Sequence, residues 1–377
     1  AIKGKNKDGN LYLKEAFNKG ALLAVVNKIN KTEKKSKQIK VTNSLNFLTK
    51  TSVIVRENSS GKIIAITGSC GKTSLKELIG KTFDKFCRTT YSPKSFNNKF
   101  GVPLSLFNLN KKDDFGIFEV GMDKKGEIDY LTKIIKPDVG VITNISYAHA
   151  KNFKNLKQIA FAKSEIMNNI VSGGSIVLNA DDRFYKFHRK IALRKKLKVY
   201  SFSLFKKNTT VNLISIKKEK TKFKAIININ SQKKYFFVSS NFENNLKNLL
   251  AAITVISIFK DIKTLNKNIF YNYQVPHGRG DFSKVKINGK NIFLIDESYN
   301  SNPLSLKSSI NNFDLINSKK NKKHLILGDM LELGRHSKKL HLEMSTIINS
   351  SSINNVHVFG KYIRETYKNI YNKKKGL

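Results

Sequence analysis

The stretch ITGSCGKTS at 66–74 decides how the chain is interpreted, and it directly follows the apolar run KIIAI at 62–66. Two glycines followed by a lysine and a hydroxyl residue are typical of loops that bind phosphate groups. A complete P-loop has a further glycine five positions before Gly71, where this chain has Ile66. The motif alone therefore leaves two interpretations open, a phosphate-binding loop or a tight turn before a solvated lysine.

The flanking sequence favours the phosphate-binding loop, because such a loop lies between a strand and the start of a helix. The run before the loop is a strand candidate, and after it a helical face is formed by Leu75, Leu78, Ile79, Phe83 and Phe86. Further strand candidates are FGIFEV (115–120), VGVIT (139–143) and SIVL (175–178). Strands and helices alternate up to about residue 270, which predicts an α/β fold with a mostly parallel sheet.

The composition is that of a globular protein, with 40% hydrophobic and 26% charged residues among 377. No uncharged apolar run approaches the roughly 18 residues that a membrane span needs. The two cysteines, Cys70 and Cys87, are no disulfide framework, which is typical of a reducing compartment. We expect a soluble, cytoplasmic, monomeric protein without membrane insertion.

The formal net charge of +43 raises the alternative of a nucleic-acid-binding protein. The lysines, however, are spread along the whole chain among asparagines and isoleucines, and no basic motif with interleaved aromatic residues occurs. A diffuse positive field of this kind attracts anionic substrates such as nucleotides. We therefore expect no nucleic-acid partner.

Three regions are expected along the chain: a first region (1–57), a central region (58–275) with the phosphate loop, and a third region (276–377). The third region contains the strand candidates NIFLI (291–295), HLILG (324–328) and VHVFG (356–360). The chain begins without methionine and ends in NKKKGL without a closing strand or helix, so both ends are expected to be incomplete.

Several side chains near the ends of the expected strands have the chemistry of a phosphate and metal site. In the loop, Lys72 can neutralise phosphate charge and Thr73 can ligate Mg²⁺, whereas Cys70 is expected to be a small loop residue and not a nucleophile. Glu119 and His149 follow two strand candidates at the carboxyl edge of the sheet, where α/β enzymes bind ligands. The alternatives are a surface glutamate and a structural histidine.

Lys163 interrupts the apolar stripe of the expected helix LKQIAFAKSEIMNNI, four residues after Ile159 and three before Ile166. A lysine on a buried face is costly unless it is paired or modified. We therefore favour a functional role for Lys163, although chance placement in a lysine-rich chain stays possible.

Polar residues are dense after two strand candidates of the third region. The segment DESYNSNP holds Asp296, Glu297, Tyr299, Asn300 and Asn302, and LGDMLELG holds Asp329 and Glu332. These segments are expected to face a cleft; the alternative is ordinary capping and turn chemistry.

In their order along the chain, these segments resemble the Mur ligases of bacterial peptidoglycan synthesis. The resemblance covers nearly the whole chain and includes DGNLYLKEAFNKGALLAVV, TGSCGKTSLKE, SFNNKFGVPLSLFNL, EVGMDKKGEI, PDVGVITNISYAHAKNF and AFAKSEI. DESYNSNP and LGDMLELG resemble the branch that joins D-alanyl-D-alanine to UDP-MurNAc-tripeptide. Another ligase of the same fold, such as a folylpolyglutamate synthase or a cyanophycin-type enzyme, is the alternative.

The resemblance implies a three-domain architecture with a uridine-nucleotide domain, a central P-loop-like ATPase domain and a C-terminal Rossmann-like domain. It also implies that ATP phosphorylates the tripeptide carboxylate and that the amine of D-alanyl-D-alanine attacks the acyl phosphate.

The same resemblance implies the residues of the site. The ATP-binding set is Gly68, Ser69, Cys70, Gly71, Lys72, Thr73, Ser74, Asn245, Arg279 and Asp296. Thr73 and Glu119 are implied for one Mg²⁺, and His149 with a carbamylated Lys163 for a second; Lys72, His149 and Lys163 form the implied catalytic group. Substrate contacts are implied for Asn97, Asn98, Tyr299, Asn300 and Asn302.

The chain departs from the family pattern before the NLLAA segment. Family members have a His-Asn pair where this chain has Asn244 and Asn245. Asn245 is expected to keep its adenine-binding role, while the role of Asn244 stays open.

Overall fold

The structure, a computed structural model, describes residues 1–376 except 5, 220–221, 240–244 and 317–320. Its largest element is a nine-stranded sheet. The strands of this sheet are β3 (Lys62–Thr67), β4 (Thr89–Tyr91), β5 (Phe115–Glu119), β6 (Val139–Ile142), β7 (Ser175–Asn179), β8 (Lys198–Ser203), β9 (Val211–Glu219), β10 (Lys222–Ile229) and β11 (Gln232–Val238).

The strands lie in the order β11-β10-β9-β8-β7-β6-β3-β5-β4. All pairings from β4 to β9 are parallel, whereas β10 pairs antiparallel with both β9 and β11. This arrangement confirms the predicted α/β fold with a mostly parallel sheet. The strand candidates of the central region coincide with β3, β5, β6 and β7 to within one residue.

No strand candidate covers β8 to β11. In β10 the buried Ala225, Ile227 and Ile229 alternate with more exposed residues, as in a strand with one face towards the core. Such a strand lacks the continuous apolar run by which the buried parallel strands were predicted.

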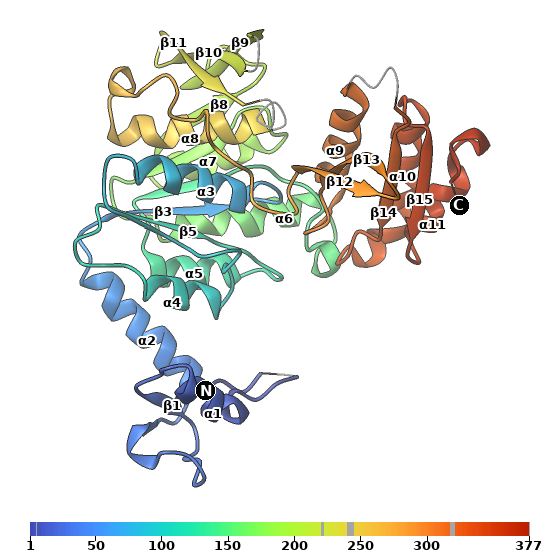
Figure 1. Cartoon of the computed structure of the whole chain (residues 1–377). Coiled ribbons are helices and arrows are strands. Elements are labelled where there is room, and N and C mark those ends of the chain that lie inside the picture. Colours follow the sequence, from blue (N-terminus) through green and yellow to red (C-terminus); the bar gives the residue numbers. More distant parts are fainter. Residues whose placement is uncertain (5, 220–221, 240–244, 317–320, 377) are drawn as a thin grey trace.

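Helices cover both faces of the sheet (Figure 1). One face packs against α3 (Lys72–Phe83) and α8 (Leu246–Phe259), and the other against α4 (Gly101–Leu106), α5 (Glu127–Ile135), α6 (Leu156–Ser164) and α7 (Tyr185–Arg194). Side chains of β3 alternate between the two cores: Ile63 and Ala65 join one, and Ile64 and Ile66 join the other.

The first region is small and is connected to the central sheet by a long helix (Figure 1). It contains α1 (Leu13–Asn18), the parallel pair β1 (Ala24–Val26) and β2 (Gln38–Lys40), and α2 (Ser44–Glu57). α2 packs against α4 and α5, so it anchors the first region on the central helices.

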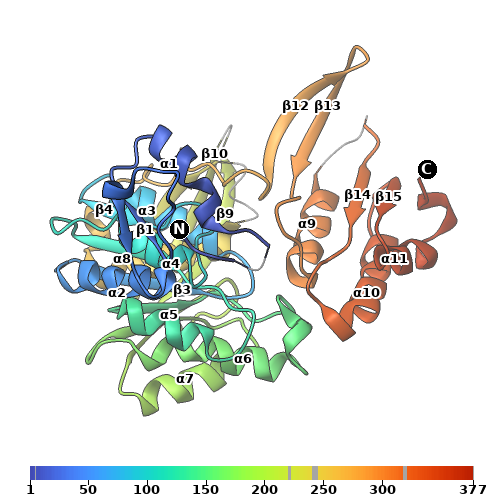
Figure 2. The same cartoon turned by 90° about the horizontal axis from the view of Figure 1, so that it is seen from below.

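The third region combines a hairpin with a small parallel sheet. The hairpin β12 (Asp281–Ile287) and β13 (Lys290–Asp296) projects from the rest of the region (Figure 2). The remaining elements are α9 (Pro303–Leu315), β14 (His324–Gly328), α10 (Ser337–Asn349), β15 (Asn355–Phe359) and α11 (Ile363–Asn369). β14 and β15 pair in parallel, and the three strand candidates of this region correspond to β13, β14 and β15.

Short 3₁₀ helices complete the described structure: η1 (Gly9–Tyr12), η2 (Lys35–Lys37), η3 (Ala150–Asn152), η4 (Glu165–Asn168), η6 (Ile262–Thr264), η7 (Gly334–His336) and η8 (Asn372–Lys374). In the part of the chain that the structure describes, no helix has the length and apolar character needed to cross a membrane. We propose, from the expected division of the sequence, that 1–57, 58–275 and 276–377 are the domains.

The core beneath α3 depends on a group of phenylalanines centred on Phe83, and this dependence is testable. Phe83 is fully buried, stacks on Phe115 at 4.2 Å and meets Phe86 and Phe259 edge-on. We expect Phe83→Ala to lower the free energy of unfolding by about 3–5 kcal/mol. Urea unfolding followed by circular dichroism measures this loss. The matched control is Phe205→Ala, because Phe205 is 80% exposed, and equal effects of the two variants would contradict this packing.

Candidate active site

The loop that precedes α3 has the geometry of an anion-binding corner. Gly68 and Gly71 adopt positive φ angles of 149° and 81°. A Cβ atom on Gly68 would lie 1.8 Å from the Thr143 Oγ1 atom, so only glycine fits there. Gly71 is the N-cap of α3 and makes no side-chain cap, which leaves the helix N-terminus available to an anion.

The segment that follows β6 holds this loop in place. The Ser69 hydroxyl donates to the Ser146 carbonyl and accepts from the Ser146 N–H. The Cys70 N–H donates to the Asn144 side chain, and the Thr143 hydroxyl donates to the Cys70 carbonyl at 2.6 Å. The loop is therefore rigid before any ligand binds.

The expected phosphate and metal residues of the loop meet Glu119 at the end of β5. The Thr73 hydroxyl donates to Glu119 Oε2 at 2.7 Å, and the Asn97 amide donates to Glu119 Oε1 at 2.7 Å. Glu119 is 1% exposed, and Lys72 is also buried, with its ammonium donating to the Gly68 carbonyl. A buried carboxylate next to a hydroxyl offers the oxygen ligands that Mg²⁺ prefers.

Ser95 joins this group, although the sequence analysis assigned no role to it. Its hydroxyl lies 3.2 Å from the Thr73 hydroxyl and accepts a hydrogen bond from Arg279 Nη2 at 3.2 Å. Arg279 stacks over the Tyr299 ring, 4.4 Å from its centroid. The third region therefore reaches the phosphate loop through Arg279.

A cleft of about 690 Å³ lies between these elements. The predicted site residues that line it are Ser69, Cys70, Gly71, Lys72, Thr73, Asn97, Asn98, Glu119, His149, Arg279, Tyr299, Asn300 and Asn302. Lining residues that the sequence did not indicate include Ser95, Lys99, Asp123, Lys124, Lys125 and Tyr130. Except for Tyr130, these residues lie in the segments SFNNKFGVPLSLFNL and EVGMDKKGEI, but the sequence alone did not show that their side chains line the cleft.

Two of the asparagines that line the cleft also cap helices. Asn98 Oδ1 accepts from the N–H groups of Phe100 and Gly101 at the start of α4. Asn302 caps α9 in a capping box with Ser305. Its Oδ1 atom also accepts from the Cys70 thiol at 3.1 Å. The pKa of the Cys70 thiol is raised by burial, so it remains protonated and acts as a small loop residue.

Five predicted residues, Gly68, Ser74, Lys163, Asn245 and Asp296, lie outside the lining of the cleft. The Ser74 carbonyl accepts from the Tyr273 hydroxyl. Asn245 is the N-cap residue of α8 but forms no side-chain cap, and its Oδ1 atom accepts from the Asn248 amide. Asn248 Oδ1 lies 2.8 Å from the place of a Cβ atom on Gly71. Asn244 falls outside the described residues.

Asp296 lies at the end of β13 and does not line the cleft. Its carboxylate accepts from the Ser298 N–H at 2.9 Å and lies 3.9 Å from the His277 ring. The hydrogen bonds from Ser298 lower the pKa of Asp296.

Lys163 is buried as predicted, at 1% exposed. Burial lowers the pKa of Lys163 well below its ordinary value, and the charge of Lys72 lowers it further. No ion pair to Lys163 is formed within the described part of the chain. The site thus contains a buried amine that burial and a neighbouring cation push towards its neutral form.

His149 follows β6 in a loop and has a positive φ angle of 53°. Its Nδ1 atom lies 3.3 Å from Asp123 Oδ1 and closer still to Glu332 Oε2. Burial lowers the pKa of His149, and the charge of Lys72 acts in the same direction, partly opposed by Glu332. A neutral imidazole at neutral pH can bind a metal ion.

Known proteins are similar to this chain over most of its length. The Mur ligase middle domain matches residues 66–256. A protein of Rickettsia prowazekii named UDP-N-acetylmuramoyl-tripeptide–D-alanyl-D-alanine ligase is 33% identical over 99% of this chain and 82% of its own length. A crystal structure of MurF from Acinetobacter baumannii has a TM-score of 0.87 at 25% identity and covers all of this chain and 80% of that one. MurF from Thermotoga maritima in complex with ADP has a TM-score of 0.82 at 25% identity, with coverages of 100% and 84%.

The buried Lys163 predicts that stability depends on pH in a specific way. Between its lowered pKa and its ordinary value of 10.5, the unfolded chain carries a proton on this lysine that the folded chain lacks. The free energy of unfolding therefore rises with pH in this window, and Lys163→Met removes this contribution. In buffers free of carbon dioxide we expect the variant to be more stable than wild type by about 1–4 kcal/mol at pH 7, with a smaller difference towards pH 10.

Urea unfolding at several pH values measures this difference. Lys157→Met is the matched control, because Lys157 is an exposed lysine of the same helix. A Lys163→Met variant that is less stable than wild type, or that follows the pH dependence of the control, would contradict a lowered pKa of Lys163 in the folded chain.

Proposed function

The chain belongs to the Mur ligase family, and from this premise we propose that it joins D-alanyl-D-alanine to UDP-MurNAc-tripeptide, with hydrolysis of ATP to ADP and phosphate. It is an ATP-dependent amide ligase of peptidoglycan precursor synthesis. The observation that carries this conclusion is the 33% identity to the Rickettsia ligase, which extends over 99% of this chain.

Amide formation from a carboxylate needs a better leaving group than oxide, and ATP supplies it. An oxygen of the tripeptide's terminal carboxylate attacks the γ-phosphorus of ATP, and ADP leaves. The amine of D-alanyl-D-alanine then attacks the carbonyl carbon of the acyl phosphate. The tetrahedral intermediate loses phosphate and a proton to give the amide. The chain contributes mainly by positioning the reactants and neutralising charge.

We assign ATP to the loop Gly68–Ser74. The uncapped N-terminus of α3 and the buried Lys72 support this assignment, because both attract phosphate oxygens. Asn245 is assigned to the adenine, since it lies at the start of α8, next to Asn248 and the loop. Arg279 and Asp296 are assigned to ATP from the third region.

The residues present fit two magnesium ions. The first would be held by Thr73 and Glu119, whose oxygens lie 2.7 Å apart. The second would be held by His149 and a carbamylated Lys163. Bound magnesium supplies charge neutralisation at the transferring phosphoryl group. Asn97 keeps the Glu119 carboxylate in place through its hydrogen bond.

Carbamylation explains why a lysine lies in the core next to another cation. A neutral amine reacts with carbon dioxide to form a carbamate anion and a proton. The lowered pKa of Lys163 favours the neutral amine that this reaction needs. The carbamate is an anion next to Lys72, so it would attract Lys72, whereas a protonated Lys163 would repel it. Its oxygens would also be ligands for the second magnesium ion.

Substrate contacts are assigned to Asn97, Asn98, Tyr299, Asn300 and Asn302, which line the same cleft as the loop. The hydrogen bond from Arg279 to Ser95 links the third region to this cleft. Closure of the third region over the bound reactants would exclude water, which otherwise hydrolyses the acyl phosphate.

Release of phosphate from ATP tests the proposed reaction. We expect release to require Mg²⁺, UDP-MurNAc-tripeptide and D-alanyl-D-alanine together, and glutamate not to replace D-alanyl-D-alanine. Phosphate release without D-alanyl-D-alanine, or with glutamate instead, would contradict the acceptor and favour another ligase of this fold.

A variant of the buried lysine tests the carbamate. We expect Lys163→Ala to lower kcat by at least about 100-fold, since removing a group that holds transition-state charge costs about 3 kcal/mol or more. Added short carboxylates such as acetate should restore part of the activity, because they can occupy the place of the carbamate. Lys157→Ala is the control. Full activity of Lys163→Ala would exclude the carbamate as a functional ligand.

A further inference from the structure

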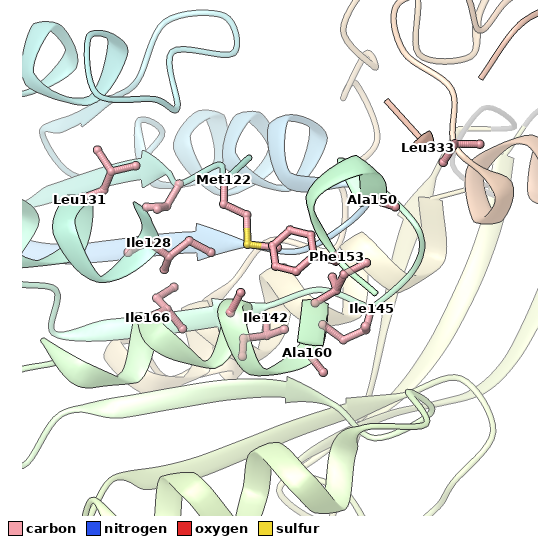
Figure 3. Packing of buried hydrophobic residues seen from close by; sticks show 14 of the residues in the cluster. Met122, Ile128, Leu131, Ile142, Ile145, Ala150, Phe153, Ala160, Ile166 and Leu333 are labelled. Carbon is pink, nitrogen blue, oxygen red and sulfur yellow. The ribbon is translucent and has the colours of Figure 1, made fainter. Parts of the chain in front are cut away.

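The third region docks on the loop that carries His149, and this contact has no part in the assignments above. Leu333 is 1% exposed and belongs to the same buried cluster as Ala150 and Phe153 (Figure 3). The Lys151 N–H donates to the Glu332 carbonyl at 2.8 Å. His336 Nε2 contacts the Phe153 carbonyl at 3.1 Å. The segment 332–336 thus forms a continuous contact with 149–153.

The backbone of this docking segment is specialised for close approach. Glu332 and Gly334 have positive φ angles of 63° and 56°. A Cβ atom on Gly334 would lie 2.8 Å from the Cα atom of Lys151, so a larger residue at 334 would push the two regions apart. A non-glycine residue in the left-handed region is energetically unfavourable and persists only where the surroundings hold it. Here the surroundings are the loop of His149.

The result of this geometry is that a carboxylate of the third region reaches the imidazole of His149. Glu332 Oε2 is in contact with His149 Nδ1, and Asp123 Oδ1 lies 3.3 Å from the same atom. Nδ1 is buried and forms no aligned hydrogen bond, although the Glu332 carboxylate is in contact with it. Lys151 Nζ lies 3.8 Å from Glu332 Oε1 and helps to hold the carboxylate.

The position of the two carboxylates distinguishes the ring nitrogens of His149. A neutral imidazole carries one proton, and two carboxylates beside Nδ1 favour that proton on Nδ1. The lone pair is then on Nε2. Histidines that bind metals commonly donate their other N–H to a carboxylate, which fixes both the tautomer and the orientation of the ring.

We propose that Glu332 is a positioning residue, which fixes the Nδ1–H tautomer and the orientation of His149 so that Nε2 binds the second cation. This inference rests on the proposed function, in which His149 is a ligand of that cation. Asp123 supports the same tautomer from within the central region. Because Glu332 belongs to the third region, its contribution to the tautomer and orientation of His149 exists only while that region is docked.

The docked third region therefore contributes to the site at two points. Arg279 reaches Ser95 at the phosphate loop, and Glu332 reaches His149 at the proposed second cation. Displacement of the third region removes both contacts together. Binding of the second cation is thereby coupled to the position of the third region.

Binding of Mn²⁺ to the full chain with a non-hydrolysable ATP analogue tests this inference, with electron paramagnetic resonance as the readout. We expect Glu332→Ala to weaken one of two Mn²⁺ sites by about 10-fold and to leave the other unchanged. Glu332→Gln should fall between wild type and Glu332→Ala, since its amide oxygen still accepts from Nδ1–H. Glu343→Gln, at an exposed glutamate of α10, is the matched control.

Two further measurements separate positioning from a general loss of structure. Nitrogen chemical shifts of the His149 ring should report Nδ1–H in wild type and a mixture of tautomers in Glu332→Ala. The double variant His149→Ala/Glu332→Ala should bind Mn²⁺ no more weakly than His149→Ala alone, because Glu332 acts through His149.

The inference would be overturned if Glu332→Ala had the Mn²⁺ affinity and the His149 ring shifts of wild type. It would also be overturned if the losses of Mn²⁺ affinity in the two single variants added up in the double variant. Failure of the proposed function has a different signature, namely a wild-type chain that releases no phosphate in the presence of both substrates. The ring shifts of His149 are measured without turnover, so they test Glu332 even in that case.

Discussion

The burial of two lysines near one another is the constraint on which the rest of the site depends. Lys72 and Lys163 are both almost inaccessible, and the charge of one lowers the pKa of the other. Within the described residues neither forms an ion pair. The charge of Lys72 calls for an anion, which the phosphates of a nucleotide can supply. Lys163 is pushed towards its neutral amine, and a carbamate would turn this side chain into an anion beside Lys72. The uncapped N-terminus of α3 and the loop at Gly68, where only glycine fits, favour binding of the same phosphate groups.

The site is divided between two parts of the chain. The central sheet supplies the phosphate loop, Glu119 and His149, and the third region supplies Arg279 and Glu332. Leu333 follows Glu332 in the chain and belongs to the same buried cluster as Ala150 and Phe153 of the loop after β6, so it keeps Glu332 beside that loop (Figure 3). A ligase with a water-sensitive intermediate benefits from this division, since the complete site then exists only when the cleft is closed.

Much of this arrangement was predictable from the sequence, because strong local signals coincide with it. Continuous apolar runs identified β3, β5, β6 and β7, and a lysine in a helical apolar stripe identified the buried Lys163. Ser95 and Asp123 lie in two of the family-like segments but were assigned no role, since their contacts join segments that are distant in the sequence. Asn98 and Asn302 line the cleft as expected but also cap helices, which no spacing in the sequence distinguishes from ligand binding. The strands β9 to β11 escaped notice because each contains two lysines and most of its residues are only partly buried or exposed.

Transfer of ¹⁸O from the tripeptide carboxylate to the released phosphate tests the acyl phosphate intermediate. The terminal carboxylate of UDP-MurNAc-tripeptide is labelled with ¹⁸O, the ligation is run with unlabelled ATP, and the released phosphate is analysed by mass spectrometry. We expect one ¹⁸O atom in each released phosphate ion, because the carboxylate oxygen that attacks ATP leaves with the phosphate when the amide forms. Amide formation with unlabelled phosphate would contradict an acyl phosphate, and with it the assignment of the site.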